Sequence, residues 1–209
     1  MIYNILQKWK LLTLRFPYRS FSKEIPKLER RKLKSNTMTI EDLFKDKTTK
    51  AKEKTEIISK WIIDTSLPTD ELIAFAEKSK DPVKGSCIEA IEYATKQNPN
   101  LADETVFTFV TNTLTEKAPR IKWESAKVIG NTAQLFPENL DLAITNLIAN
   151  TEHEGTVVRW SAAFALGEIL KLKTSHNTTL LPTLENISEK EEKNSIKKIY
   201  LDAIKKTKK

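Results

Sequence analysis

The sequence predicts an all-α protein, an α-solenoid of about five antiparallel helix pairs that repeat every 37–38 residues. Four segments that align without gaps carry this prediction, and they begin at Val83, Ile121, Val158 and Ile196. In each segment, apolar or small residues stand at offsets +4, +5, +7 and +8, which is the pattern of one buried helix face. The chain of 209 residues also has only 4 glycines, too few for the tight hairpins of an all-β protein. A two-helix unit cannot bury its apolar face alone, so successive units should stack.

The repeat also places the other helices. A divergent first pair is expected at 39–47 and 50–63, and a shorter helix is expected before each aligned segment. These shorter helices are expected at 69–79, 101–115, 139–150 and 178–189. Four prolines, Pro68, Pro99, Pro137 and Pro182, are expected before or inside their first turns, where a missing N–H costs little. Residues 105–111 alternate like a strand, but their place in the repeat favours a helix.

Two stretches resemble HEAT repeats: VRWSAAFALGEIL, which starts at Val158, and LLPTLENISEKEEKNSIKKIYLDAI, which starts at Leu180. The resemblance covers roughly residues 39–206. It implies an armadillo-like, curved α-solenoid whose second helices line the concave side, and it implies no chemistry. Members of this family usually carry an acidic residue six positions before the base of the second helix, pairing across stacked repeats as a ladder. Glu116 and Glu191 match this position, whereas Lys78 and His153 do not.

Charge divides the chain into two parts. Residues 1–37 hold ten basic and two acidic side chains, whereas residues 38–209 hold 25 basic and 26 acidic ones. We expect 1–37 to be a basic, poorly ordered extension, either an upstream start or a targeting segment, and 38–209 to be the repeat domain. No apolar run is long enough to span a membrane, and a single cysteine fits a reducing compartment. The predicted location is cytoplasmic, or mitochondrial if 1–37 is a presequence.

Residues that do chemistry are scarce. The chain has one cysteine, Cys87, on a predicted buried stripe, and two histidines, His153 and His176, in different connections. The triplet Glu152-His153-Glu154 offers oxygen and nitrogen ligands, but adjacent residues on a turn seldom converge on one ion. We therefore predict no catalytic residues, no metal, no cofactor and no enzyme activity.

The outward face of the second helices is the candidate binding site. Advancing 100° per residue places offsets +2 and +6 opposite the buried stripe. These offsets hold Trp123, Trp160 and Phe164, with Lys127, Gln134, Glu168 and Lys171 at the border. Two interpretations stay open: the three rings form an exposed patch on the concave face, or neighbouring helices pack them as core. Trp61, Phe75, Phe107, Phe109 and Phe136 are expected in the core.

The predicted function is a non-enzymatic, monomeric scaffold or adaptor that binds a protein or peptide on its concave face. The predicted contacts are Trp123, Lys127, Arg159, Trp160, Phe164 and Lys171. One alternative is a DNA-binding, alkylation-repair type of HEAT-like protein, since Trp123, Trp160 and Arg159 are similar to the lining of such clefts. Nucleic acid is disfavoured because the body lacks a stripe of Lys and Arg, and Lys127 stands where an acid is wanted. A second alternative, implied by family analogy alone, is a maturation or chaperone factor for a metabolic or pigment-bearing protein.

Overall fold

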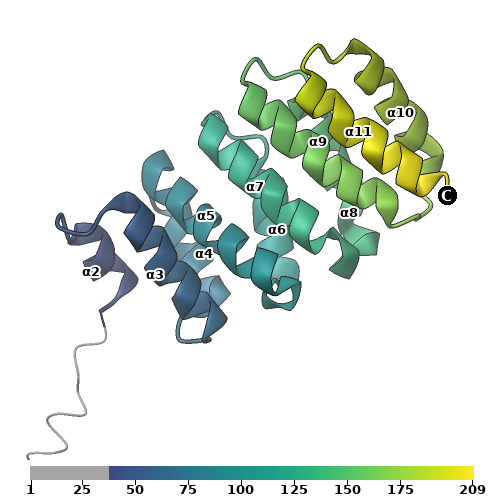
Figure 1. The fold of residues 1–209 in the computed structure, drawn as a ribbon. Coiled ribbons are helices and arrows are strands. Elements are labelled where there is room, and N and C mark those ends of the chain that lie inside the picture. The colour runs from purple at the N-terminus through teal and green to yellow at the C-terminus, as the bar shows by residue number, and fades with distance from the viewer. Residues whose placement is uncertain (1–37) are drawn as a thin grey trace, which may run out of the picture. The chain divides into compact units, whose positions relative to one another are not determined.

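The computed structural model describes residues 38–209, and within them Thr39–Lys209 form one compact unit of ten α-helices with no strand. The helices make five antiparallel pairs (Figure 1). The first helices of the pairs are α2 (Ile40–Lys45), α4 (Thr69–Glu77), α6 (Glu104–Thr113), α8 (Leu140–Asn150) and α10 (Asn177–Lys190). The second helices are α3 (Ala51–Ile63), α5 (Asp81–Gln97), α7 (Pro119–Thr132), α9 (Thr156–Lys171) and α11 (Asn194–Thr207). The predicted extension 1–37 lies outside the described residues.

The strand-like segment 105–111 is helical, as the repeat predicted. Asp103 caps this helix, its carboxylate accepting a hydrogen bond from the Val106 N–H at 2.9 Å. Val106, Phe107, Phe109 and Val110 are all buried, so the apolar residues fill one helical face rather than alternating between two sides. Tertiary packing and a helix cap therefore override the β-propensity of this segment.

Three of the four prolines lie at helix starts, and one does not. Pro68 is the N-cap residue of α4, and Pro99 and Pro137 open short 3₁₀ turns that precede α6 and α8. Pro182, however, is the sixth residue of α10, so the prediction that it falls before or inside the first turn was wrong. Helix α10 begins at Asn177, and packing holds it together despite one missing backbone hydrogen bond.

The second helices form one layer and the first helices another (Figure 1). Successive second helices are packed closely along their length, whereas successive first helices contact one another much less. Three open grooves separate the first helices, between α4 and α6, α6 and α8, and α8 and α10. This closer packing of the second helices is what an array curved toward them requires, as the HEAT resemblance implied, and we call their outer surface the concave face.

The core runs between the two layers. Phe107 and Phe109 are buried, and Trp61, Phe75 and Phe136 are half-buried against the core, which agrees with their predicted placement. Cys87 is also fully buried, and burial raises the pKa of its thiol to about 12. A thiol with that pKa holds almost no thiolate at neutral pH, so Cys87 is a core residue rather than a nucleophile.

Candidate functional site

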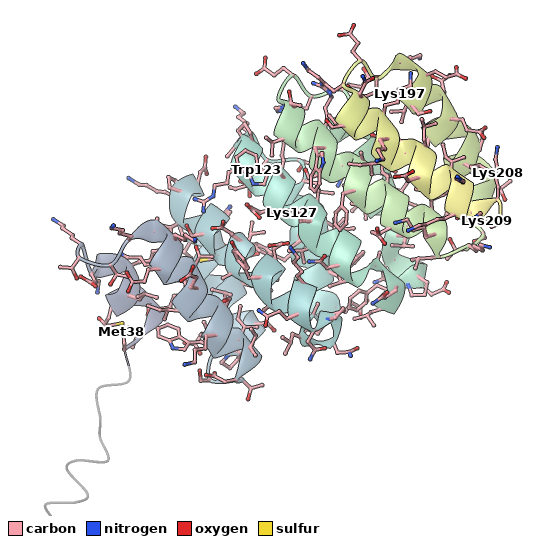
Figure 2. The ribbon with its side chains drawn as sticks, in the orientation of Figure 1. Met38, Trp123, Lys127, Lys197, Lys208 and Lys209 are labelled. Carbon is pink, nitrogen blue, oxygen red and sulfur yellow. The ribbon has the colours of Figure 1, made fainter. Side chains whose placement is uncertain are left out.

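One stripe of each second helix faces the concave side, and we number it from the aligned repeat starts at Val83, Ile121, Val158 and Ile196. Positions −1, +2, +6 and +10 lie on this concave stripe because they recur at helical spacing. On α7 the stripe holds Arg120, Trp123, Lys127 and Asn131, and on α9 it holds Val157, Trp160, Phe164 and Glu168. Trp123 and Lys127 lie on this face of α7 in Figure 2.

Two glycine contacts fix the register between neighbouring second helices. The side chain of Phe164, at +6 on α9, lies on Gly130, at +9 on α7; a Cβ on Gly130 would lie 2.4 Å from the Phe164 ring. Likewise, the Arg120 side chain, at −1 on α7, lies over Gly85, at +2 on α5, where a Cβ would be 3.2 Å from Arg120 Cδ. Position +2 of α5 thus faces position −1 of α7. In the same register, Trp123 at +2 on α7 corresponds to Val157 at −1 on α9.

Trp160 and Phe164 stack on each other along α9. Their ring centroids are 5.9 Å apart and the rings are within 8° of parallel. Trp160 remains 40% exposed and Val157 53% exposed, whereas Phe164 and Trp123 are half-buried. We call Trp123, Val157, Trp160 and Phe164 the aromatic patch. Its exposed centre is Trp160, and the half-buried Phe164 holds that ring in place.

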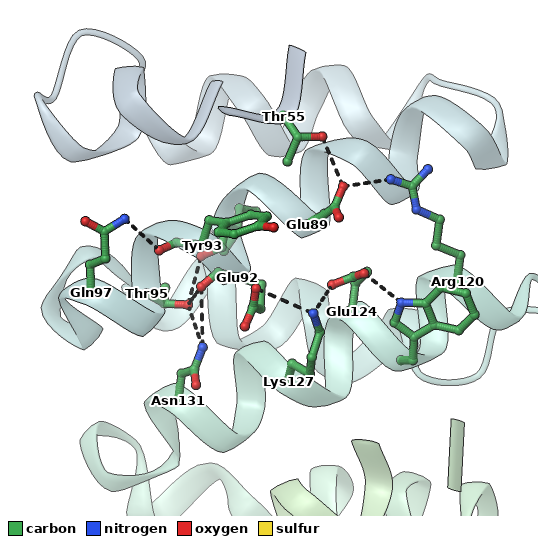
Figure 3. Close-up of polar contacts among 12 residues, drawn as sticks. Thr55, Glu89, Glu92, Tyr93, Thr95, Gln97, Arg120, Glu124, Lys127 and Asn131 are labelled. Atoms are coloured by element: carbon green, nitrogen blue, oxygen red, sulfur yellow. Dashed lines mark hydrogen bonds and ion pairs between the residues drawn. The ribbon is translucent and has the colours of Figure 1, made fainter. Parts of the chain in front are cut away.

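The neighbouring junction, between α5 and α7, is built from charges (Figure 3). Lys127 Nζ lies 2.7 Å from Glu124 Oε2 and 3.5 Å from Glu92 Oε2, and both carboxylates are almost fully buried. Trp123 Nε1 donates a hydrogen bond of 2.6 Å to the other oxygen of Glu124. We call Glu92, Glu124 and Lys127 the carboxylate–lysine network, and Trp123 links it to the aromatic patch.

Burial and pairing act against each other in this network. Burial raises the pKa of Glu124, although hydrogen bonds and charge from Lys127 partly offset the rise. Burial by itself would lower the pKa of Lys127, but its two carboxylate partners outweigh burial and raise that pKa. Lys127 therefore stays a cation held inside the molecule, and it does not stand free at the border of the patch as the sequence prediction placed it.

A second set of ion pairs contacts α3. Arg120 donates from a guanidinium nitrogen to Glu89 Oε2 at 2.8 Å, and the Thr55 hydroxyl donates to the same oxygen at 3.0 Å. These contacts join α3, α5 and α7 across the concave face (Figure 3). The positive charge of Arg120 is thus neutralised within the array.

Arg159 lies away from the concave stripe, although the sequence prediction grouped it with the tryptophans. Its guanidinium bonds Glu191 at 3.1 Å and the carbonyls of His153 and Glu154. At position +1 it points to the edge of the repeat, where it lines the groove between α8 and α10. Arg159 therefore stabilises the stack of repeats, because its side chain donates hydrogen bonds to carbonyl oxygens of a turn and forms an ion pair with the next repeat.

The Arg159–Glu191 pair belongs to the ladder that the HEAT resemblance implied. Lys84 pairs with Glu116 at 2.7 Å in the equivalent place two repeats earlier. Between these pairs, Lys122 finds no acid, since His153 occupies that position, and its Nζ donates to the Asn150 side chain at 2.9 Å. The ladder therefore has two ionic rungs separated by an amide rung.

The remaining predicted groups form contacts within the molecule. Lys171 pairs with Glu168, one helical turn earlier on α9. His153 Nδ1 accepts a hydrogen bond from the Gly155 N–H inside its turn. Among residues 38–209, no three His, Cys, Asp or Glu side chains gather as a metal site, and no helix is long and apolar enough to cross a membrane.

Comparison with known proteins places this geometry in a fold. No protein-family model matches the chain, and none of the curated proteins does. Among solved structures, a designed armadillo repeat protein in complex with the peptide (KR)4 matches with a TM-score of 0.64 at 14% identity, over 80% of each chain. A second designed armadillo repeat protein matches with a TM-score of 0.63 at 12% identity, over 85% of each chain.

A natural protein matches as well. The complex of CpcE and CpcF of phycocyanin lyase from Nostoc sp. PCC7120 gives a TM-score of 0.59 at 15% identity, over 78% of this chain and 94% of that chain. Residues 39–209 have the armadillo/HEAT-like repeat fold. At these identities the likeness establishes the fold alone, and it confirms the HEAT-like resemblance predicted from the sequence.

Sequence reasoning missed four residues of the site. Val157 precedes the aligned segment, although its position at −1 has the same helical phase as Trp160. Glu92 and Gly130 share position +9, which the helical phase places beside +2, and Glu124 is at +3, but the sequence prediction considered only positions +2 and +6. A search for pairs at +9 and +6 in consecutive repeats would have found Glu92 with Lys127 and Gly130 with Phe164.

Proposed function

We propose that this protein is a non-enzymatic scaffold that binds a protein or peptide partner on its concave face, with the aromatic patch as the main contact. The observation that carries the proposal is the exposed Trp160 ring, which stacks on the half-buried Phe164 ring. Binding energy tends to concentrate in a few aromatic anchors. A half-exposed tryptophan also leaves apolar area uncovered, which a partner can bury.

The fold supports the same reading. One neighbouring structure, a designed armadillo repeat protein, holds a peptide. In the present chain, the thiol of Cys87 is buried, and Arg120 and Lys127 on the concave stripe of α7 form ion pairs with glutamates. The cations expected to contact a partner, Lys127, Arg159 and Lys171, are each paired with an acid, so their contribution to binding is secondary.

The two alternatives lead to different expectations. DNA binding needs free cations along the concave face, but Arg120, Lys127 and Lys171 are neutralised by glutamates. The likeness to phycocyanin lyase supports the second alternative, a maturation factor, whose partner would itself be a protein or its attached group. The two alternatives can therefore be distinguished by which molecule binds to the concave face, DNA or a protein.

The test compares Trp160→Ala with the matched control Leu142→Ala, which removes a 53% exposed side chain from α8 in the other layer. A partner is isolated from source cells with the parent protein, purified, and its affinity measured for all three proteins. We expect Trp160→Ala to lower affinity by about 2 kcal/mol, roughly 30-fold, because truncating an anchor has this effect. Leu142→Ala should leave affinity unchanged.

Thermal melting and DNA retention complete the test. Trp160→Ala should cost about 1 kcal/mol of stability, the worth of one aromatic pair, because the ring is already partly in water. A loss of about 3–5 kcal/mol would assign Trp160 to the core instead. Steeply salt-dependent retention on duplex DNA, weakened in the variant, would favour the repair-type alternative.

A further inference from the structure

We infer that the two grooves on either side of α6 form a second binding surface, which takes a lysine- and arginine-bearing peptide segment. This inference goes beyond the proposed function, because both grooves lie between first helices and their lining contains no residue of the aromatic patch. Three observations on the described residues carry it. The first helices around these grooves hold acids and no base, the two grooves share part of their lining, and a buried hydroxyl group in one of them has no partner.

The charge of the middle first helices has one sign. Helices α4, α6 and α8, with the leading residues 99–103 and 137–139, contain no lysine or arginine, and we call them the acidic layer. The acids of this layer are Asp70, Glu71, Glu77, Asp103, Glu104, Glu138 and Asp141. Every second helix, in contrast, contains both signs, and residues 38–209 hold 25 basic and 26 acidic side chains in all. The acidic layer is therefore a local property of the fold, and a field of one sign attracts partners of the other.

The acids at these grooves have few cationic partners within the molecule. Among residues 38–209, only one base lines either groove, Lys84, and its ammonium nitrogen lies 2.7 Å from Glu116. No lysine or arginine of the same residues forms an ion pair with Glu77, Glu104 or Glu138. The exposed bases in the adjoining connections line neither groove, and they are Lys78, Lys80 and Lys117. A cationic ligand therefore does not have to break an existing ion pair to reach these carboxylates.

The two grooves meet across α6. Their volumes are about 770 and 280 Å³, and Thr108 and Asn112 line both of them. The larger groove is also lined by Ile73 and Phe109, which can contact the methylene groups of a lysine or arginine while its charged end reaches a carboxylate. Among residues 38–209, no three His, Cys, Asp or Glu side chains converge on one point. A ligand with several separated positive charges therefore fits this surface better than a single metal ion, which needs converging ligands.

A buried hydroxyl group in the smaller groove lacks a partner. Thr111 lines this groove and is only 4% exposed, yet its side-chain oxygen has no hydrogen-bond partner among residues 38–209. Glu138 and Asp141 line the same groove, and Asp141 stays 88% exposed although its Oδ1 lies 3.3 Å from His176 Nδ1. An unpaired buried hydroxyl group is costly. An ammonium or guanidinium group between these carboxylates can donate a hydrogen bond to it and remove that cost.

The experiment uses the full chain and two octapeptides, octalysine and an alternating glycine–serine peptide. Calorimetry measures their binding in about 0.05 M and 0.5 M salt, a range over which exposed charges become screened. We expect octalysine alone to bind saturably, and to bind at least about ten-fold more weakly at the higher salt concentration. The full chain has a net charge of +7, so general attraction between the protein and the peptide does not explain such binding.

The matched variants remove the same number of charges from different places. Glu77→Gln with Glu138→Gln changes one acid in each groove and should weaken octalysine binding about five-fold. Glu53→Gln with Asp202→Asn removes two exposed acids from second helices and should leave the binding unchanged. Thr111→Val removes the unpaired hydroxyl group, so it should weaken binding about three-fold while the melting temperature stays the same or rises.

Three results would overturn the inference. The first is the absence of saturable octalysine binding at the lower salt concentration. The second is equal octalysine affinity of the groove variant and its charge-matched control. The third is octalysine binding that requires Trp160, which would assign basic segments to the concave face. Otherwise Trp160→Ala should leave octalysine binding unchanged, so a purified partner whose affinity does not depend on Trp160 would overturn the proposed function and leave this inference intact.

Discussion

The α5–α7 junction and the α7–α9 junction use the same two repeat positions for opposite chemistry. At +9 and +6, the first junction pairs Glu92 with Lys127, and the second places Phe164 on Gly130. Both junctions pack closely, so helix stacking does not dictate which chemistry the concave face presents. The Glu92–Lys127 pair is largely buried between its helices. Gly130, in contrast, leaves room for the Phe164 ring, on which the exposed Trp160 ring stacks. A repeat array can thus confine an aromatic surface to one junction.

The largest effect should come from placing a charge in α9, the helix that carries the aromatic patch. Ala163 is fully buried, so Ala163→Asp would bring an unpaired carboxylate into a close helix interface and cost about 3–5 kcal/mol. Thermal melting measures this cost. The control is Ala149→Asp on α8, where the parent residue is exposed and the change should matter little. Equal melting of the two variants would show that the helix phase assigned to α9 is wrong.

The next largest loss of stability should come from a change in the carboxylate–lysine network at the α5–α7 junction. Lys127→Met leaves Glu92 and Glu124 without their cation, although their side chains are only 8% and 5% exposed, so we expect a loss of about 2 kcal/mol. Adding Glu124→Gln should recover part of that loss. The control is Lys52→Met, because its pair with Glu56 is exposed and 3.8 Å long, and such pairs contribute about 0–1 kcal/mol. Denaturant unfolding of the four proteins would show whether the network stabilises the junction.

The sequence predicted the repeats far better than these junctions. Helix periodicity and the 37–38-residue spacing are local signals, and they located all ten helices, including the strand-like segment at 105–111. Helical spacing also placed Trp160 and Phe164 on the same face of one helix, although the stacking of their rings was not predicted. The partners of Lys127 and Arg159 did not follow, because each pairing depends on the register between helices about 30 residues apart in sequence. The close approach of Arg120 to Gly85 and of Phe164 to Gly130 also depends on that kind of register, and a glycine gives no periodic signal in the sequence.

A glycine exchange at each junction should separate binding from stability. Gly130→Ala would place a Cβ 2.4 Å from the Phe164 ring, which must swing away and unstack Trp160. Helix propensity gains about 1 kcal/mol, which offsets much of the lost packing. We therefore expect nearly unchanged melting but at least about ten-fold weaker partner binding.

Gly85→Ala is the matched control at the α5–α7 junction. Its Cβ would meet Arg120 Cδ at 3.2 Å, in a flexible side chain that can shift by a few tenths of an ångström. This variant should gain stability and keep its affinity. Loss of affinity in both variants would mean that the partner covers the α5–α7 junction as well.

The smallest effect should be on the free energy of unfolding at acid pH. There, Glu191 of the ladder and Glu124 of the carboxylate–lysine network should change this free energy in opposite directions. Burial alone would raise the pKa of Glu191, but hydrogen bonds from Arg159 and from the Lys193 N–H outweigh it and lower that pKa below its ordinary value of 4.5. Glu191 therefore contributes stability above pH 4.5, and this contribution is lost as the pH falls toward the lowered value. Glu124, whose pKa is raised by burial, binds its proton more tightly in the folded state and so favours folding as the pH falls toward 4.5.

Unfolding by denaturant between about pH 6 and pH 3.5, the range around these carboxyl groups, measures both contributions. Glu191→Gln should flatten the acid-side loss of stability by about a few tenths of a kcal/mol, a small amount because burial of Glu191 opposes the effect of its hydrogen-bond partners. Glu124→Gln should steepen the loss by a similar amount, because it removes a group that favours folding on acidification. An unchanged or flatter curve for Glu124→Gln would mean that Glu124 is held as a well-solvated ion, and the α5–α7 junction would then be more open than its packing indicates.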